Sequence, residues 1–206
     1  QGSLSIYDLR TRQEIESLPA SEGFVRAAFS PKEPLLAYSF VTDAASTNAQ
    51  FGVRLWNGAT RRNVGEFRIR GAANALSFSK DGQRLLIAES DPSNQLSIWR
   101  VPEGTKLASY AAPQRTSSGT PFAAADDLSI AAHRIEPDIL RVVDLRTGEE
   151  RWQAVTTDTI GINVLAKTSF IFVSPSLFDG LNRSLRTFFF HPNKKKASQH
   201  QSQRNP

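Results

Sequence analysis

The chain contains no cysteine and no methionine among its 206 residues. Without cysteine it has neither a disulfide framework nor a metal site built on thiolates. The missing methionine predicts a truncated or processed start, so we expect a fragment of a larger protein. No stretch reaches the roughly 18 consecutive apolar residues that a membrane span needs, and no signal peptide is visible. The compartment stays unknown, with the cytoplasm slightly favoured.

The sequence also lacks the concentrated basic stripe of a nucleic-acid-binding protein. Its formal net charge of +5 arises at one end, because residues 181–206 hold six basic residues and no acidic one. Residues 1–180 hold the other 19 basic residues and all 20 acidic residues. Their basic side chains are scattered singly or in pairs, whereas nucleic-acid binders gather them on one face. We therefore expect neither a nucleic-acid partner nor a membrane partner.

What the sequence does contain is a short strand pattern that returns four times. The copies are residues 4–9, 53–57, 96–100 and 140–145. Their equivalent positions are Tyr7, Trp56, Trp99 and Val143, at spacings of 49, 43 and 44 residues. A nearly constant period of this length indicates an array of repeated four-stranded units. We expect the aromatic residues of this position to be buried as wedges between units, each contributing about 2 kcal/mol or more.

Runs rich in Val, Ile, Leu and aromatic residues, separated by turn residues, predict the strands of each unit. The second unit has runs at residues 24–30, 35–40, 51–57 and 63–69. The third has runs at residues 73–79, 84–90, 95–100 and 106–111, and the fourth at residues 120–124, 128–134, 139–145 and 151–155. The predicted fold is all-β, a partial β-propeller of about four four-stranded antiparallel blades that is incomplete at both ends.

The ends of the repeat region predict half blades. Residues 3–19 supply two strands and residues 160–175 another two, so residues 1–175 form the propeller part, with complete blades at 24–69, 73–111 and 120–155. The two halves could join into a four-bladed ring, but we favour one part of a larger propeller whose other blades or attached domains are missing from this chain. Residues 176–206 are expected to form an irregular basic tail, disordered from residue 191 on, which is either native or the product of a frameshift.

The repeated pattern resembles the WD-repeat propeller family. Its third unit is the best match, with Ser79-Lys80-Asp81-Gly82 before one strand and Trp99 near the end of the next strand. The resemblance implies a scaffold that assembles protein complexes without catalysing a reaction. The family's Gly-His pair is absent and its Trp-Asp pair is never complete, so we expect packing and backbone hydrogen bonds, rather than the family's side-chain network, to hold the blades.

A second resemblance is confined to the fourth unit. Residues 144–152 are similar to the docking motif of pyrroloquinoline-quinone-type propellers, in which a closing Trp, here Trp152, packs against the next blade. This resemblance implies a quinoprotein-like dehydrogenase or an envelope-assembly propeller as the alternative function. The Asp-x-x-Thr-Gly part of the motif is equally a common hairpin turn.

Candidate catalytic residues are few. Of the three histidines, His133 lies in a predicted strand and the other two lie in the tail, and none stands in a recognisable nucleophile–base pattern. The paired carboxylates Asp126 and Asp127 suit acid–base work or calcium, but they occupy the position of a turn in the previous unit, so a solvated turn is favoured. We therefore expect no enzyme, no catalytic residue, no metal site and no cofactor.

The predicted function is a non-enzymatic protein–protein interaction scaffold whose partner is a protein or peptide. Loops on a rigid framework are the usual carriers of binding. The candidate partner-binding residues are Glu22, Arg70 and Arg115, from the links into each first strand, and Asp43 and Asn48 from the inserted loop 42–50. A purely structural fragment without separate activity is the remaining interpretation.

Overall fold

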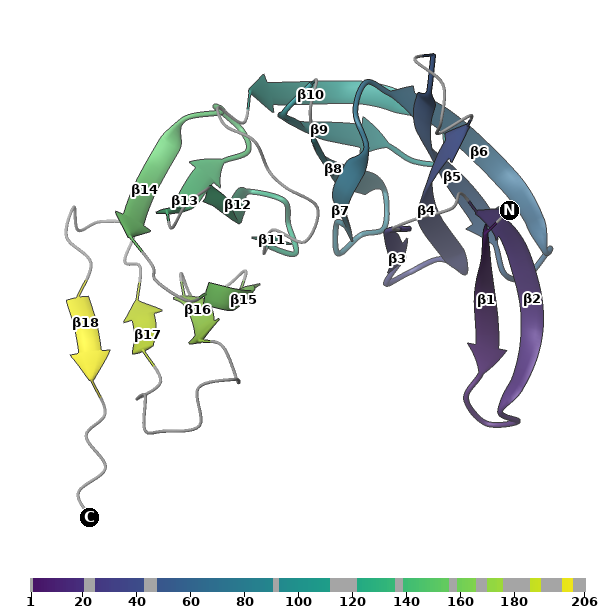
Figure 1. The fold of residues 1–206 in the computed structure, drawn as a ribbon, viewed down its shortest axis with the longest axis horizontal. Coiled ribbons are helices and arrows are strands. Elements are labelled where there is room, and N and C mark those ends of the chain that lie inside the picture. The colour runs from purple at the N-terminus through teal and green to yellow at the C-terminus, as the bar shows by residue number, and fades with distance from the viewer. Residues whose placement is uncertain are drawn as a thin grey trace. The chain divides into compact units, whose positions relative to one another are not determined.

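In the computed structural model of the chain, every regular element among the described residues is a β-strand (Figure 1). The described residues are 2–20, 25–42, 48–90, 93–111, 122–135, 139–155, 159–165, 170–175, 186–189 and 198–201. For the last four of these segments the description covers only the backbone pairing. Two compact units divide the chain, residues 1–112 and 113–206. Within the described part, no helix has the length and the apolar character needed to cross a membrane.

The first unit contains a two-stranded sheet and two four-stranded sheets, all antiparallel. The two-stranded sheet pairs β1 (Gly2–Asp8) with β2 (Gln13–Ala20). The next sheet consists of β3 (Ala27–Phe29), β4 (Leu35–Thr42), β5 (Gln50–Asn57) and β6 (Arg62–Ile69). The third consists of β7 (Ala73–Phe78), β8 (Arg84–Glu89), β9 (Gln95–Arg100) and β10 (Thr105–Ala111). Each strand pairs with its neighbours in the chain.

The second unit repeats the same order of pairing. One sheet consists of β11 (Phe122–Ala124), β12 (Ile130–Ile135), β13 (Ile139–Asp144) and β14 (Glu150–Val155). A further sheet consists of β15 (Thr159–Leu165), β16 (Phe170–Pro175), β17 (Arg186–Phe189) and β18 (Ser198–Gln201). In the four-bladed ring that the sequence left open, β15 and β16 would complete the sheet of β1 and β2. The structure instead pairs β16 with β17, in a separate four-stranded sheet.

The all-β fold and the repeated four-stranded antiparallel sheets confirm the coarse prediction from the sequence. Some strands differ from it. β3 begins at Ala27, later than expected, and at the preceding residue the N–H of Arg26 donates to the hydroxyl Oγ of Ser39 (2.8 Å). β17 and β18 both lie in residues 176–206, for which we expected an irregular tail, and they pair with each other through their backbones.

A β-bulge marks the same place in four hairpins. In each hairpin, one residue of the second strand has no partner on the first strand. This residue lies next to the pair formed by Tyr7, Trp56, Trp99 or Val143. These unpaired residues are Ile15, Val64, Leu107 and Arg151. A bulge depends on backbone register and not on one side chain, so its recurrence confirms that the four positions of the sequence repeat are structurally equivalent.

The core of the first unit lies between its sheets. Side chains of β4, β5 and β6 pack on those of β7, β8 and β9, and the rings of Phe67 and Trp99 stack with centroids 5.0 Å apart. Trp56 packs with Leu18 and Tyr38 in a second cluster. The burial of Trp56 and Trp99 therefore confirms their prediction as core residues.

Tyr7 corrects that prediction for the first copy. Its side chain is 56% exposed, and its hydroxyl donates to the exposed carboxylate of Glu14 (3.3 Å). The two-stranded sheet packs through its other face, where Leu4 and Ile6 contact the cluster around Trp56. A repeated position is buried only where a neighbouring sheet covers it, and among the described residues none covers Tyr7.

A buried hydrogen-bond network corrects the expectation that the sheets lack one. Glu89, at the end of β8, is 1% exposed. Its oxygen Oε1 accepts hydrogen bonds from Gln95 Nε2 and Ser97 Oγ (2.8 Å each), and Ser97 Oγ in turn accepts one from the indole N–H of Trp99 (2.8 Å). Oε2 accepts from the Arg70 backbone N–H and from Ser93 Oγ (3.0 Å each). The network fixes the β8–β9 hairpin and the residue that follows β6.

Candidate binding site

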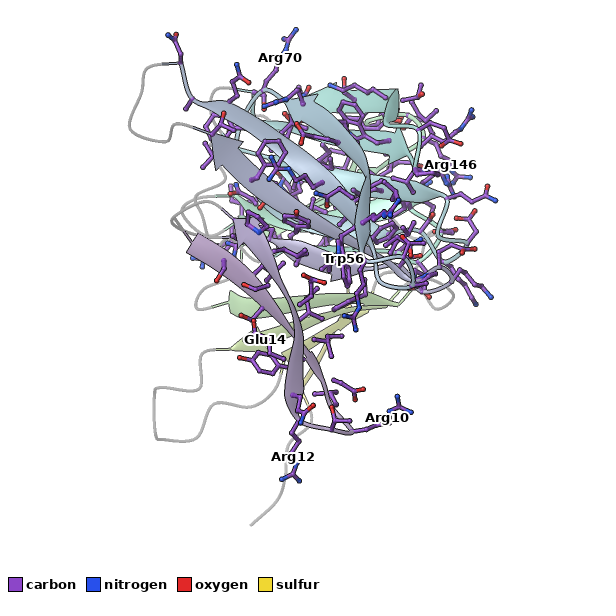
Figure 2. The ribbon with its side chains drawn as sticks, turned by 90° about the vertical axis from the view of Figure 1, so that its right-hand side faces the viewer. Arg10, Arg12, Glu14, Trp56, Arg70 and Arg146 are labelled. Atoms are coloured by element: carbon purple, nitrogen blue, oxygen red, sulfur yellow. The ribbon has the colours of Figure 1, made fainter. Side chains whose placement is uncertain are left out.

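The sequence placed the binding surface at the links between sheets and in the inserted loop. Arg70 follows β6, and its side chain is exposed and points away from the ribbon (Figure 2). Asn48 is exposed in the connection between β4 and β5. Glu22, Asp43 and Arg115 lie outside the described residues. Neither Arg70 nor Asn48 lines the pocket described next.

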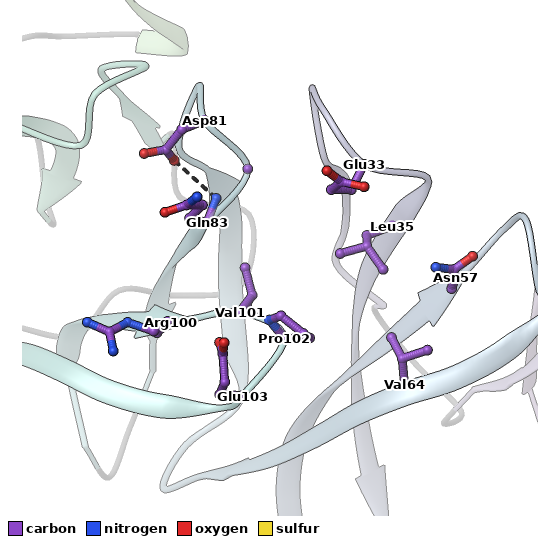
Figure 3. A pocket seen from close by; sticks show the side chains of 11 residues that line it. Glu33, Leu35, Asn57, Val64, Asp81, Gln83, Arg100, Val101, Pro102 and Glu103 are labelled. Carbon is purple, nitrogen blue, oxygen red and sulfur yellow. Dashed lines mark hydrogen bonds between the residues drawn. The ribbon is translucent and has the colours of Figure 1, made fainter.

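A pocket of about 540 Å³ lies at the other ends of the strands, where the sheets β3–β6 and β7–β10 present their hairpin turns (Figure 3). One wall comes from the first of these sheets and is made of Glu33, Leu35, Asn57 and Val64. The other wall comes from the second sheet and is made of Asp81, Gly82, Gln83, Arg100, Val101, Pro102 and Glu103. This volume falls within the usual range of ligand pockets.

The turn between β7 and β8 forms one rigid side of the pocket. The carboxylate of Asp81 accepts hydrogen bonds from the Ser79 hydroxyl and from the Gln83 backbone N–H (3.0 Å). Both bonds lower the pKa of Asp81, and the bond from Ser79 contributes most. The turn therefore favours the charged carboxylate and fixes its position. Gly82 has a φ of 73°, and a Cβ there would lie 2.7 Å from the Ser30 Oγ of the neighbouring turn. Glycine at this position therefore lets the two turns approach each other.

The apolar base of the pocket follows from the bulge in β6. Val64 is the unpaired residue, and the bulge leaves its side chain 43% exposed at the pocket wall. The next residue, Gly65, lies directly under the β9–β10 turn, because a Cβ there would be 2.9 Å from the carbonyl oxygen of Pro102. This close approach of two backbones brings Val64, Val101 and Pro102 into one lining, next to the buried Leu35.

The charged groups of the lining are three acids and one base. Asp81 is engaged in its own turn, as described above. Glu33 and Glu103 come from different turns, and within the described residues their carboxylates have no hydrogen-bond or ion-pair partner. Figure 3 shows Glu33 and Asp81 near the tips of neighbouring turns, with Pro102 and Val64 deeper in the opening. The pocket thus combines an apolar base with carboxylates that are free to accept hydrogen bonds.

The sequence candidates for catalysis lie elsewhere. His133 on β12 is buried, and neither ring nitrogen has a hydrogen-bond partner among the described residues. Burial, and then the nearby positive charge of Arg141, lower its pKa to about 4. Asp126 and Asp127 are exposed, and Asp127 accepts the N–H of Ser129 (2.9 Å), which confirms their prediction as a turn. Across the described segments, no three potential metal ligands gather in one place.

Sequence reasoning missed the pocket because three of its determinants are not visible in a sequence pattern. A bulge, the approach of Gly65 to Pro102 and the approach of Gly82 to Ser30 depend on how two sheets pack. One signal was available: the turns Ser79–Gly82 and Pro102–Gly104 are rich in turn residues and stand at the same ends of adjacent strands. A search of the turn ends, in addition to the links between units, would have included this surface.

Comparison with protein-family models gives no match for this chain. Comparison with curated proteins gives none either. The functional conclusion therefore depends on the geometry and the chemistry of the pocket.

Proposed function

We propose that the chain is a non-enzymatic module that binds a protein or peptide partner, and that its repeated sheets are blades of a WD-type β-propeller. The observation that carries the binding role is the pocket between the turn ends of two packed sheets. It is lined by exposed Val64 and by Glu33 and Glu103, whose carboxylates have no partner in the part of the chain that the structure describes. Its walls are held by backbone turns, so a ligand would meet a preorganised surface, which lowers the cost of binding.

Two further observations favour binding over catalysis. The only histidine in the described segments whose side chain is characterised, His133, is buried and carries no carboxylate partner that would orient it as a base. The pocket itself contains no histidine, serine or lysine. Its chemistry is that of a recognition surface, with apolar contact area and hydrogen-bond acceptors.

The quinoprotein-like alternative receives less support, because its motif has a local explanation. Asp144 accepts the backbone N–H of Arg146 (2.8 Å) and pairs with Arg151 in its own hairpin. Asp8 makes the same kind of turn in the first hairpin, where its carboxylate accepts the N–H of Arg10 (2.7 Å) without any closing tryptophan. Trp152 packs on a cluster of its own sheet. The Asp-x-x-Thr-Gly residues thus act as a hairpin turn.

A peptide-display library tests the proposal directly. The full chain is immobilised and panned against random 12-residue peptides, and the affinity of enriched peptides is measured by isothermal titration calorimetry. Val64→Trp fills the pocket at an exposed position and should weaken binding at least about tenfold. Leu107→Trp is the matched control, because Leu107 is the bulge residue of the next sheet, is similarly exposed at 42%, and does not line the pocket.

Two results would contradict the proposal in different ways. Enriched peptides that bind Val64→Trp as tightly as the wild type would place the binding surface elsewhere. A library without any enriched peptide would favour the interpretation of a structural fragment without binding activity. Thermal unfolding of both tryptophan variants shows whether either has lost its fold.

A further inference from the structure

The charge of the pocket lining opposes the charge of the unit that contains it. Residues 1–112 hold 13 basic and 11 acidic residues, whereas the lining holds three acids and one base, Arg100. Lys32 and Lys80 belong to the same turns but do not line the pocket. Within the lining itself carboxylates outnumber basic side chains, which favours a cationic group over a phosphate or carboxylate ligand.

The free acceptors of the lining are the carboxylates of Glu33 and Glu103. Asp81 already accepts two hydrogen bonds in its turn, whereas these two have no partner among the described residues. They come from turns of two different sheets, one from each wall. A charged donor at either carboxylate would form charge-assisted hydrogen bonds, which are shorter and stronger than those between neutral groups.

The apolar part of the lining restricts the shape of that donor. A small cation would leave Leu35, Val64 and Pro102 without contact, and the described residues offer no cluster of three metal ligands. Lysine and arginine side chains have an apolar stem and a charged end, and they bury the stem on apolar surface while the charge stays at the rim. One such side chain can satisfy both halves of the lining.

We propose that the pocket recognises an extended polypeptide segment through a lysine or arginine side chain, whose stem lies on Val64 and Pro102 and whose cation is held by Glu33 and Glu103. This inference rests on the proposed function, since it names the chemistry of the peptide that the module binds. Arginine is favoured over lysine because its planar guanidinium presents several N–H donors in a geometry that matches a carboxylate.

A panel of twenty peptides tests this chemistry. Each has the sequence Gly-Ser-Ala-Leu-X-Leu-Ala-Ser-Gly, where X is each amino acid in turn, and its affinity for the full chain is measured by fluorescence anisotropy. We expect Arg and Lys at X to bind best and Asp and Glu to bind worst, with the preference weakening as salt is raised. The double variant Glu33→Gln/Glu103→Gln should bind the Arg peptide about tenfold more weakly.

Matched charge variants keep the result interpretable. Asp126→Asn/Glu149→Gln removes the same two negative charges from exposed turn residues of the second unit, and it should leave the affinity unchanged. Glu33→Lys/Glu103→Lys should reverse the order of the panel, so that Glu at X binds better than Arg. This gain for an acidic peptide cannot result from a general loss of folding.

The outcomes separate this inference from the proposed function. If display-enriched peptides lose binding to Val64→Trp but show no preference for Arg or Lys, the pocket binds peptides and the cation inference is overturned. The inference is also overturned if both charge-neutralised double variants weaken binding equally. If no peptide binds the chain at all, the proposed function fails together with the inference.

Discussion

The sheets β7–β10 and β11–β14 each bury a polar side chain on their second strand, and the two side chains differ in their hydrogen bonds. Glu89 in β8 receives four hydrogen bonds on its two oxygens. His133 in β12 receives none on its two ring nitrogens within the described residues. Ser93, Gln95 and Ser97, which follow Glu89, supply three of its donors, and the Arg70 N–H supplies the fourth. The strand positions opposite His133 are Phe122 and Arg141.

This difference shows when a buried polar group stabilises a repeated sheet. A satisfied group fixes one arrangement of its neighbours, whereas an unsatisfied one has lost its hydrogen bonds to water without replacement. We therefore interpret Glu89 as an anchor of the first unit and His133 as a weak point of the second unit. Variants at the two positions, and at the turns beside them, can break or sharpen this contrast.

Removing the anchor should have the largest effect. Glu89→Ala leaves the Arg70 N–H, Gln95 and Ser97 without their buried acceptor, and we expect the free energy of unfolding to fall by about 4 kcal/mol. Urea denaturation followed by tryptophan fluorescence measures the loss. The control Glu103→Ala, an exposed glutamate without a described partner, should change stability by less than about 0.5 kcal/mol. A similar small loss for both variants would mean that the network does not anchor the sheet.

The weak point predicts a pH effect of nearly the same size. The pKa of His133 is lowered to about 4 in the folded chain, against a usual pKa near 6.5. Between these values the unfolded state holds more protons. The stability that depends on neutral His133 is therefore complete above pH 6.5 and falls by about 3 kcal/mol as the pH decreases to 4.

A swap between the two sheets isolates this pH effect from that of the carboxylates. Ile87 in β8 is equivalent to His133 in β12. Each lies two residues after the residue that pairs with the repeated position, which is Trp99 in one sheet and Val143 in the other. His133→Ile should flatten the pH dependence of unfolding between 4 and 6.5, measured as the difference from the wild type. Ile87→His should introduce the same dependence into the first unit. Parallel curves for wild type and His133→Ile would contradict the burial of a neutral histidine.

The turns that precede β8 and β12 give a smaller contrast. Gly82 and Leu128 occupy equivalent left-handed positions, with φ of 73° and 53°. Gly82→Ala should cost about 1.5 kcal/mol, because alanine is strained at this φ and its Cβ would approach Ser30 Oγ to 2.7 Å. Adding Ser30→Ala removes the contact but not the strain, so the double variant should recover part of the loss in thermal unfolding. No recovery would show that the approach of the two turns is not tight.

The repeat allowed the fold class and most strands to be predicted. The runs at residues 95–100 and 151–155 correspond closely to β9 and β14, because alternating β-branched and aromatic residues between turn residues encode strands locally. The prediction that Tyr7 is a core residue was wrong, because burial at this position depends on a neighbouring sheet that covers it. The network of Glu89 was missed because no sequence pattern marks Ser93, Gln95 and Ser97 as donors to a buried carboxylate.

The candidate site was harder to predict than the fold. The sequence directed attention to Arg70 and Asn48, at the links and in the inserted loop, because long loops commonly carry function. The pocket instead depends on the bulge at Val64 and on the approach of two glycines to neighbouring backbone and side-chain atoms. Such contacts form only when the sheets pack, so local patterns do not reveal them.

Nuclear magnetic resonance mapping of a bound peptide tests the pocket most directly. The Arg peptide of the panel is added to the isotope-labelled full chain, and backbone amide shifts are followed in the titration. We predict the largest changes at Val64, Gln83 and Glu103, with little change at Arg70 and Asn48. Changes centred on Arg70 and Asn48, with the pocket amides unmoved, would contradict the account.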